Sequence, residues 1–182
     1  MGTRRRRGLA ALLGLTVVSL GPGAFLLALF TDTAASTGSF ASGTIDITSS
    51  PAVAYTVTNM MPGDTNTATM TIANAGTAQL RYSLATTATT TLGAALTLTV
   101  KTLGTNCATF DGTTILAATA LNGAAIGSPT QGAQAGDRVL NAATNEVLCF
   151  RVTLPLTAAN TLQGLTSAAT FTFDAEQVVN NP

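Results

Sequence analysis

The sequence predicts an all-β protein, a two-layer antiparallel β-sandwich of jelly-roll type preceded by an apolar N-terminal helix. Apolar side chains alternate with Thr, Ser, Ala and Asn in short rows that recur every 10 to 20 residues. This alternation is typical of strands with one buried and one solvated face. Turn-forming residues separate the rows, and no stretch shows the apolar face of an amphipathic helix.

The N-terminus has the pattern of an export signal, which we place at residues 1–28. Four arginines, Arg4 to Arg7, precede an apolar run from Gly8 to Phe30. Such basic residues stay in the cytoplasm while the apolar run enters the membrane. We expect cleavage after Ala28, with Leu29 as the first mature residue. The alternative is a retained anchor, because the whole run is just long enough to cross a bilayer. The membrane is then a partner only through this segment.

After the signal, residues 29–43 show no periodicity and predict a flexible N-terminal arm. A sandwich domain is expected over residues 44–177, followed by a tail, residues 178–182, that should fray. About 150 residues suffice for one domain with a buried core.

The expected strands follow one another through this domain. The main rows place apolar side chains at alternate positions: Val53, Tyr55 and Val57; Ala68, Met70 and Ile72; Leu80, Tyr82 and Leu84; Leu96, Leu98 and Val100; Leu148, Phe150, Val152 and Leu154; Phe171, Phe173 and Ala175. Shorter candidates lie at residues 44–47, 113–116 and 138–140, which gives eight or nine strands in total. That number fits a jelly roll.

Turn-forming residues predict the connections between the strands. Met61-Pro62-Gly63-Asp64 predicts a type II turn that the Asp64 carboxylate caps. Asn74-Ala75-Gly76-Thr77 predicts a hairpin-like connection, and Asp111-Gly112 predicts a further turn. Residues 117–136, rich in Ala and Gly, predict a long surface excursion.

Charge and composition exclude several functions. From Leu29 onward the chain has four basic and eight acidic residues, a net charge of −4, which argues against nucleic acid as a partner. The chain contains no histidine, the residue most often used as a general base and as a zinc ligand. We therefore expect no catalytic residues, no cofactor and no metal site.

Four charged residues in predicted strands could bind a ligand or form ion pairs. Asp174 and Glu176 lie two apart on one face of a strand and could hold a cation, but two solvated carboxylates are the simpler interpretation. Arg81 and Arg151 are expected to pair with carboxylates.

The two cysteines, Cys107 and Cys149, are expected to form a disulfide, because an even number of cysteines in an exported chain favours pairing. The alternative is a pair of buried free thiols.

Three sequence blocks follow one another behind the signal. They are Phe40-Ala41-Ser42-Gly43-Thr44-Ile45-Asp46-Ile47; Met61-Pro62-Gly63-Asp64 with Met70-Thr71-Ile72-Ala73-Asn74-Ala75-Gly76-Thr77; and Leu154-Pro155-Leu156 with Phe171-Thr172-Phe173-Asp174-Ala175-Glu176-Gln177. With these blocks in this order, the sequence resembles the TasA/camelysin (CalY) family over most of its length.

The resemblance implies a secreted protein of the extracellular matrix or cell surface that is exported through the ER-type signal peptidase often called SipW. It also implies a structural subunit that polymerises with itself, and with related matrix subunits, into biofilm fibres. The arm of one subunit adds as a strand to the next. Carried onto this sequence, the donor segment is residues 29–42, with Phe30 and Phe40 as its anchors.

Two other functions stay open. Some camelysin relatives carry a metallopeptidase label, but this chain lacks the H-E-x-x-H pattern that such chemistry needs. The second alternative is a monomeric surface module that binds a glycan or a host protein. The expected aromatic side chains mostly fall in core-facing rows, which argues against a glycan platform.

Overall fold

The computed structural model describes residues 39, 41–51 and 60–181. The chain divides into two units, Met1–Ser39 and Phe40–Pro182, and every element described here belongs to the second. These elements are β1 (Ile47–Ser50), β2 (Thr65–Asn74), β3 (Leu80–Thr87), α1 (Thr91–Ala95), β4 (Thr97–Thr102), β5 (Thr114–Ala120), β6 (Ala125–Ile126), β7 (Arg138–Leu140), β8 (Asn145–Thr153), a 3-10 turn (Asn160–Leu162) and β9 (Thr170–Gln177).

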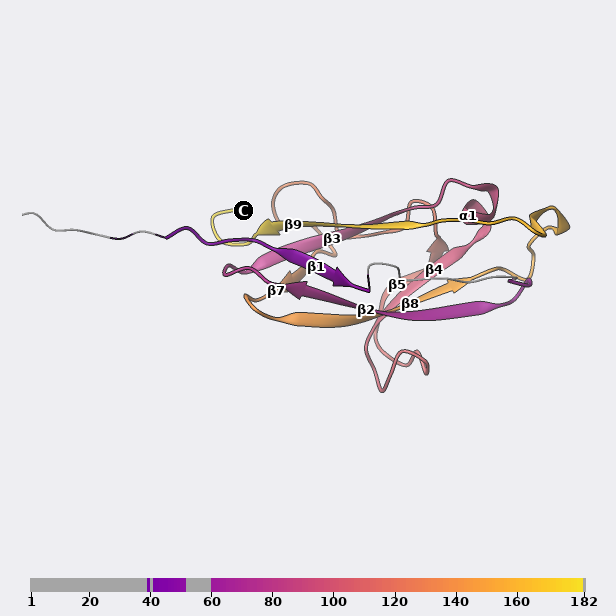
Figure 1. Cartoon of the computed structure of the whole chain (residues 1–182), viewed down its shortest axis with the longest axis horizontal. Helices are drawn as coiled ribbons and strands as arrows, with labels where there is room; N and C mark the ends of the chain where they lie inside the picture. The colour runs from indigo at the N-terminus through magenta and orange to yellow at the C-terminus, as the bar shows by residue number, and fades with distance from the viewer. Residues whose placement is uncertain (1–38, 40, 52–59, 182) are drawn as a thin grey trace, which may run out of the picture. The chain divides into compact units, whose positions relative to one another are not determined.

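The strands form two antiparallel sheets that face each other, so the predicted all-β sandwich is confirmed (Figure 1). The first sheet has the order β1-β2-β8-β4-β5. In the second sheet β3 is central, with β9 along one edge and the short strands β6 and β7 along the other. The chain passes from one sheet to the other between β2 and β3, β3 and β4, β5 and β6, β7 and β8, and β8 and β9, as it does in jelly rolls.

The core lies between the two sheets and consists of the predicted apolar rows. Ile72, Leu98 and Phe150 of the first sheet and Leu80 of the second are fully buried. Phe150 meets Phe171 edge-on, with ring centroids 5.5 Å apart, so an aromatic pair joins the sheets. Burial of such side chains contributes roughly 1.5–3 kcal/mol each and is the main force that holds the layers together.

Two connections show how turn chemistry sets the topology. Gly63 has φ of +94° and the Asp64 amide donates to the Met61 carbonyl at 2.9 Å, which confirms the predicted turn. The hairpin expected at residues 74–77 is wrong, because β2 and β3 belong to different sheets. The buried Asn74 amide donates to the carbonyls of Ala78, Leu140 and Asn141, and it thereby turns the chain into the second sheet.

Other differences lie at the ends of elements. The first strand begins at Ile47 rather than at residue 44, because the preceding residues bond to a loop instead of a strand. The expected excursion over residues 117–136 is wrong in its first half, since β5 runs to Ala120 and β6 joins the second sheet. The expected fraying of the tail is wrong at Asn181, which is 7% exposed and donates to Glu176 at 2.7 Å.

The expected N-terminal apolar helix and the strand row at residues 53–57 lie outside the described residues. Within the described part of the chain, no helix is long and apolar enough to cross a membrane.

Candidate functional site

The chain enters the sandwich at Thr44, the first described residue that hydrogen-bonds to it. The Thr44 carbonyl accepts from the amides of Thr77 at 3.0 Å and Ala78 at 3.2 Å, and the Asp46 carbonyl accepts from Ala75 at 2.8 Å. Gly76 permits this close approach, because a Cβ at that position would lie 2.3 Å from the Thr44 oxygen. The segment just before β1 is therefore held by backbone bonds to the β2–β3 loop.

Beyond this anchor, half of one β2 edge has no partner among the described strands. β8 pairs with β2 along Thr65–Ala73, whereas β1 pairs only with residues 71–74. On the β1 side, the stretch from Thr65 to Met70 is therefore open within the described part of the chain. Alternate residues of a strand turn their N–H and C=O groups to opposite edges, so every second residue of this stretch turns its backbone groups toward that side.

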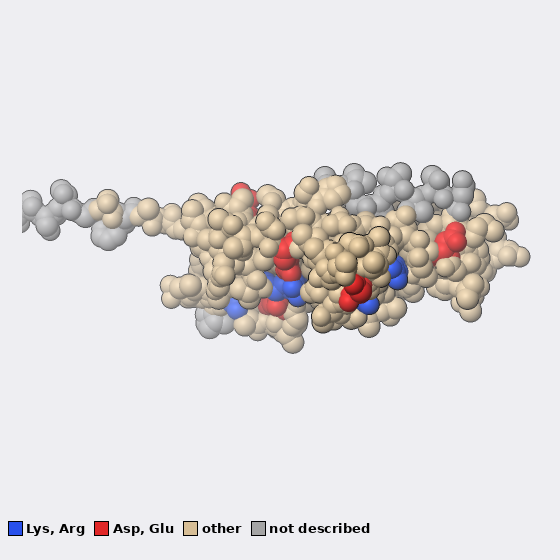
Figure 2. Space-filling view, turned by 90° about the horizontal axis from the view of Figure 1, so that it is seen from below, with Lys and Arg blue, Asp and Glu red and all other residues tan. Residues whose placement is uncertain are grey.

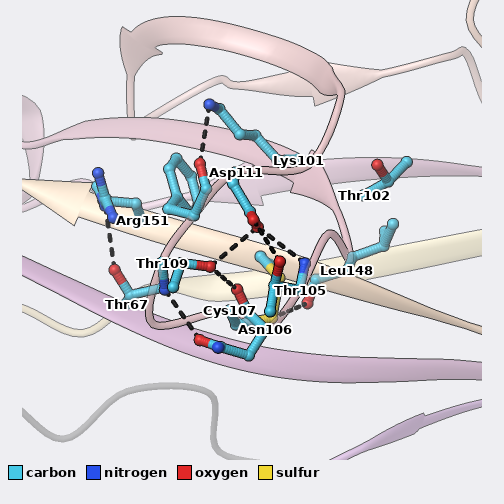
Figure 3. Close-up of a disulfide and its surroundings, with 12 residues drawn as sticks. Thr67, Lys101, Thr102, Thr105, Asn106, Cys107, Thr109, Asp111, Leu148 and Arg151 are labelled. Atoms are coloured by element: carbon cyan, nitrogen blue, oxygen red, sulfur yellow. Dashed lines mark hydrogen bonds between the residues drawn. A yellow bond between two sulfur atoms is a disulfide. The ribbon is translucent and has the colours of Figure 1, made fainter.

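On the outer face of the first sheet, the predicted disulfide is present in the structure. Cys107, in the β4–β5 loop, is bonded to Cys149 in the middle of β8, with the two Cα atoms 5.1 Å apart. Thr69 and Lys101 flank Cys149 on the neighbouring strands. The bond therefore holds the loop of residues 103–113 across the sheet (Figure 3).

The same loop places Phe110 on the sheet between two cations, a feature that the sequence analysis missed. Phe110 is 6% exposed, and the Cζ atom of Arg151 lies 3.8 Å from its ring centroid. The Nζ atom of Lys101 lies 5.0 Å from the centroid and donates to the Phe110 carbonyl at 3.0 Å. The expected carboxylate partner of Arg151 is wrong within the described residues, because its Nε instead donates to Thr67.

Asp111 holds the loop together from inside. Its carboxylate accepts from the Thr105 amide and hydroxyl and from the Thr109 hydroxyl, at 2.7–2.9 Å. The hydroxyl hydrogen bonds of Thr105 and Thr109 lower the pKa of Asp111 below its usual value. Gly112 is required beside it, since a Cβ there would lie 1.8 Å from the Thr102 carbonyl. The loop is therefore ordered by its own bonds as well as by the disulfide.

A buried polar group joins the two sheets at one end of the core. The Tyr82 hydroxyl of β3 donates to Glu146 of β8 at 2.5 Å, and Arg138 of β7 forms an ion pair with the same carboxylate. Burial, followed by the hydrogen bond to Glu146, raises the pKa of Tyr82 well above its usual range. The hydrogen bond with Glu146 raises the pKa of Arg138 in turn. Both shifts keep the Tyr82 hydroxyl protonated and the Arg138 guanidinium charged near neutral pH, which fits a structural role for these two side chains.

On the outer face of the second sheet, the predicted ion pair of Arg81 is confirmed. Its Nε lies 2.6 Å from Glu176, and its Nη2 donates to the Asn181 carbonyl. Burial by itself raises the pKa of Glu176, but the hydrogen bonds from Asn181, the Gly132 amide and Arg81 outweigh it and lower that pKa below its usual value. The side chain of Asp174, two residues away, makes no hydrogen bond or ion pair with any described residue.

Surface charge is sparse and mixed. Figure 2 shows small groups of neighbouring acidic and basic side chains on a surface that is mostly uncharged. On this face the charged side chains of the described residues form no continuous basic stripe for a phosphate backbone.

The donor set does not fit a catalytic zinc. The sequence has no histidine, and both cysteines are joined in the disulfide. The described residues contain no set of three His, Cys, Asp or Glu side chains that could hold a metal ion by themselves. A zinc peptidase needs three protein ligands and a base.

The remaining predicted site residues are not placed. Ala28 and Leu29 at the expected cleavage site, and Phe30 and Phe40 as expected donor anchors, lie outside the described residues.

Comparison with known proteins identifies the family. No curated protein gives a significant match to the chain. Residues 7–104, more than half of the sequence, match the family described as camelysin metallo-endopeptidase. The match includes β1, the β2–β3 connection and β4, and it ends before the disulfide-bonded loop closes. This chain therefore belongs to the camelysin family.

Proposed function

We propose that this protein is a secreted structural subunit that polymerises into extracellular fibres of a biofilm matrix by strand addition. In this proposal, residues 29–42 of one copy pair with the open edge of β2 in the next copy. The observation that carries the proposal is the stretch from Thr65 to Met70, which has no partner on the β1 side among the described residues; the β1 pairing with residues 71–74 separates it from the anchored segment at Thr44. An unpaired edge is a hazard unless the protein uses it.

The geometry of the edge suits a donor strand. Six residues of β2 have no partner on this side among the described residues, and backbone hydrogen bonds along such an edge give affinity without demanding a particular sequence. Met70 is 3% exposed and faces the core, while Thr69 on the other face is exposed. A donor that alternates apolar and polar residues therefore fits, and Phe30 and Phe40 are its proposed anchors.

The anchor at Thr44 gives signal cleavage a role in this assembly. Since Thr44 is fixed to the sandwich, the residues before it can reach a neighbouring copy only when they are free at their N-terminus. Removal of the signal by an ER-type signal peptidase after Ala28 would release them.

We further propose that the chain is not a peptidase, despite the name of its family. The absence of histidine from the sequence and the disulfide-bonded state of both cysteines support this. The proposed partners are other copies and related matrix subunits.

Electron microscopy of two chains, residues 29–182 and 43–182, tests the assembly. Every described strand lies within both chains, so they differ only in the arm. We expect fibres from the longer chain alone. The double variant Phe30→Ala/Phe40→Ala should also lose fibres, whereas Thr33→Ala/Thr37→Ala, its matched control in the same arm, should keep them.

Hydrogen exchange identifies the occupant of the edge. The amides of the Thr65–Met70 stretch that point away from β8 should exchange fast in monomers and slowly in fibres. If they are already protected in monomers, the chain's own residues 52–59 occupy the edge and the proposed acceptor is wrong. Monomers from both chains at high concentration and low pH would instead favour a monomeric surface-binding module.

A further inference from the structure

A small polar cavity lies on the outer face of the second sheet, away from the β2 edge. Its volume is about 40 Å3, and its charged and hydroxyl lining comes from Arg81, Ser83, Ser128, Asp137, Asp174 and Glu176. A site of this volume holds an ion with a water molecule or two but no organic ligand.

Ser83 is the unexplained group in this cavity. Its side chain is 2% exposed, and its Oγ is the buried side-chain oxygen that has no hydrogen-bond partner among the described residues. A buried hydroxyl that loses its water partners and gains none in return destabilises the folded state. A bound ion or water molecule would give the Ser83 hydroxyl the partner that the described residues do not provide.

Asp174 faces the same ligand position. It lies directly opposite Ser83 in the β3–β9 register, and side chains opposite each other on one face have Cβ atoms about 5 Å apart. The Asp174 carboxylate, which is exposed at the mouth of the cavity, also has no hydrogen-bond or ion-pair partner among the described residues. An oxygen of each side chain is thus free to bind one shared ion.

The other charged groups around the cavity set the sign of that ion. The Glu176 carboxylate forms an ion pair with Arg81 and accepts hydrogen bonds from the Gly132 amide at 3.1 Å and from the Asn181 side chain. Asp137 accepts hydrogen bonds from the backbone amides of Ser128 at 3.0 Å and Gln134 at 2.7 Å, and both of these donors are uncharged. With Glu176 neutralised by Arg81, two carboxylate charges remain, so a divalent cation balances the site and an anion is repelled.

We propose that this cavity is a calcium site in which the Asp174 carboxylate and the Ser83 hydroxyl bind the ion and Asp137 supplies the second negative charge. All ligands are hard oxygens, which suit Ca2+ rather than zinc or copper. Calcium accepts irregular shells of six to eight oxygens, so water completes its coordination, whereas Mg2+ demands a near-ideal octahedron. The ion would join β3 and β9 to the loop of residues 127–137.

Calorimetric titration and thermal unfolding of the full chain, purified after export from its host and stripped with a chelator, test the site. Affinities of extracellular calcium modules lie near 10−4–10−3 M. With a Kd of about 0.5 mM, 10 mM CaCl2 should raise Tm by about 5 °C. The same concentration of MgCl2 should give less than half of that shift.

Two variants locate the ion. Asp174→Asn should abolish the Ca2+-dependent shift, and Ser83→Ala should weaken Ca2+ binding about tenfold. Asp46→Asn removes the same charge from an exposed carboxylate far along the chain and should leave the shift unchanged. A Tm without saturable dependence on Ca2+, or a shift that survives Asp174→Asn, would overturn the proposal and assign the cavity to water.

Discussion

Arg151 stacks on Phe110, with its Cζ atom 3.8 Å from the ring centroid. The arginine stands on β8 and the phenylalanine on the disulfide-bonded loop, so this contact fixes the loop to the sheet at a second point besides the Cys107–Cys149 bond. The planar guanidinium of arginine suits such stacking better than lysine does.

Phe110→Leu should destabilise the protein by about 1–2 kcal/mol, because leucine keeps most of the apolar contact but loses the attraction to cations. Chemical denaturation of Phe110→Leu, Arg151→Gln and the double variant measures the pair. We expect a coupling energy of about 0.5–1 kcal/mol. Additive single effects would show that the stacking contributes nothing.

Removal of the disulfide by Cys107→Ser/Cys149→Ser should lower the free energy of unfolding by about 4 kcal/mol, on the model in which a crosslink restricts the unfolded chain. The separation of 42 residues sets that magnitude. Limited proteolysis should then cut first within residues 103–113, which lose their tie to β8. Reduction of the unmodified protein should reproduce both effects, and an unchanged denaturation midpoint would contradict the prediction.

The strands were predictable because burial on one face imposes a period of two, as in Leu148, Phe150 and Val152. The path between strands was less predictable. The Asn74 side-chain amide, at the point where the chain turns, donates to the carbonyls of Leu140 and Asn141, more than 60 residues away. No pattern in the neighbouring sequence predicts a contact over such a distance along the chain.

The candidate site was predictable only in part. The cysteine pair followed from an even count and an export signal. The contacts of Phe110 did not, because its loop has no periodicity and its cations come from two other strands. The open edge of β2 depends on how far β1 extends, and element ends are the least certain part of a prediction from sequence.

Tyr82 should make the protein sensitive to alkali. Its pKa is raised in the folded state, whereas in the unfolded chain it is about 10. Above pH 10 the unfolded chain therefore releases a proton that the folded chain keeps, and stability falls as pH rises. Tyr82→Phe should flatten this alkaline limb and cost about 2 kcal/mol at pH 7, because a hydrogen bond to a charged group is lost. Denaturation midpoints from pH 7 to 11 measure both effects, and a steep alkaline limb in the variant would assign the sensitivity elsewhere.

Glu176 should contribute to sensitivity at the acid end. Its pKa is lowered in the folded state, so its contribution is complete above the usual carboxyl value near 4 and is lost as pH falls further. Glu176→Gln should lower Tm at pH 7 and show a shallower loss of Tm between pH 5 and pH 2. Asp46→Asn, an exposed carboxylate whose side chain bonds to no described residue, is the control and should keep the acid limb of the unmodified protein.

Gly76→Ala should loosen the anchor of the arm while it leaves the sandwich folded. The added Cβ would lie 2.3 Å from the Thr44 carbonyl and 2.9 Å from the Asp46 amide, so the incoming chain must move away from the β2–β3 loop. Overpacking of this kind costs about 1–3 kcal/mol, and here it weakens only the hydrogen bonds of Thr44 and Asp46.

Hydrogen exchange should therefore accelerate at Ala75 and Thr77, whose amides donate to those carbonyls, while the amides of β8 stay protected. Ser49→Ala, on the exposed face of β1, should change neither. If the Ala75 and Thr77 amides keep their protection in Gly76→Ala, the β2–β3 loop has moved to make room for the new Cβ and the hydrogen bonds to Thr44 and Asp46 are intact. Gly76 would then not determine the anchor on which the strand-addition proposal depends.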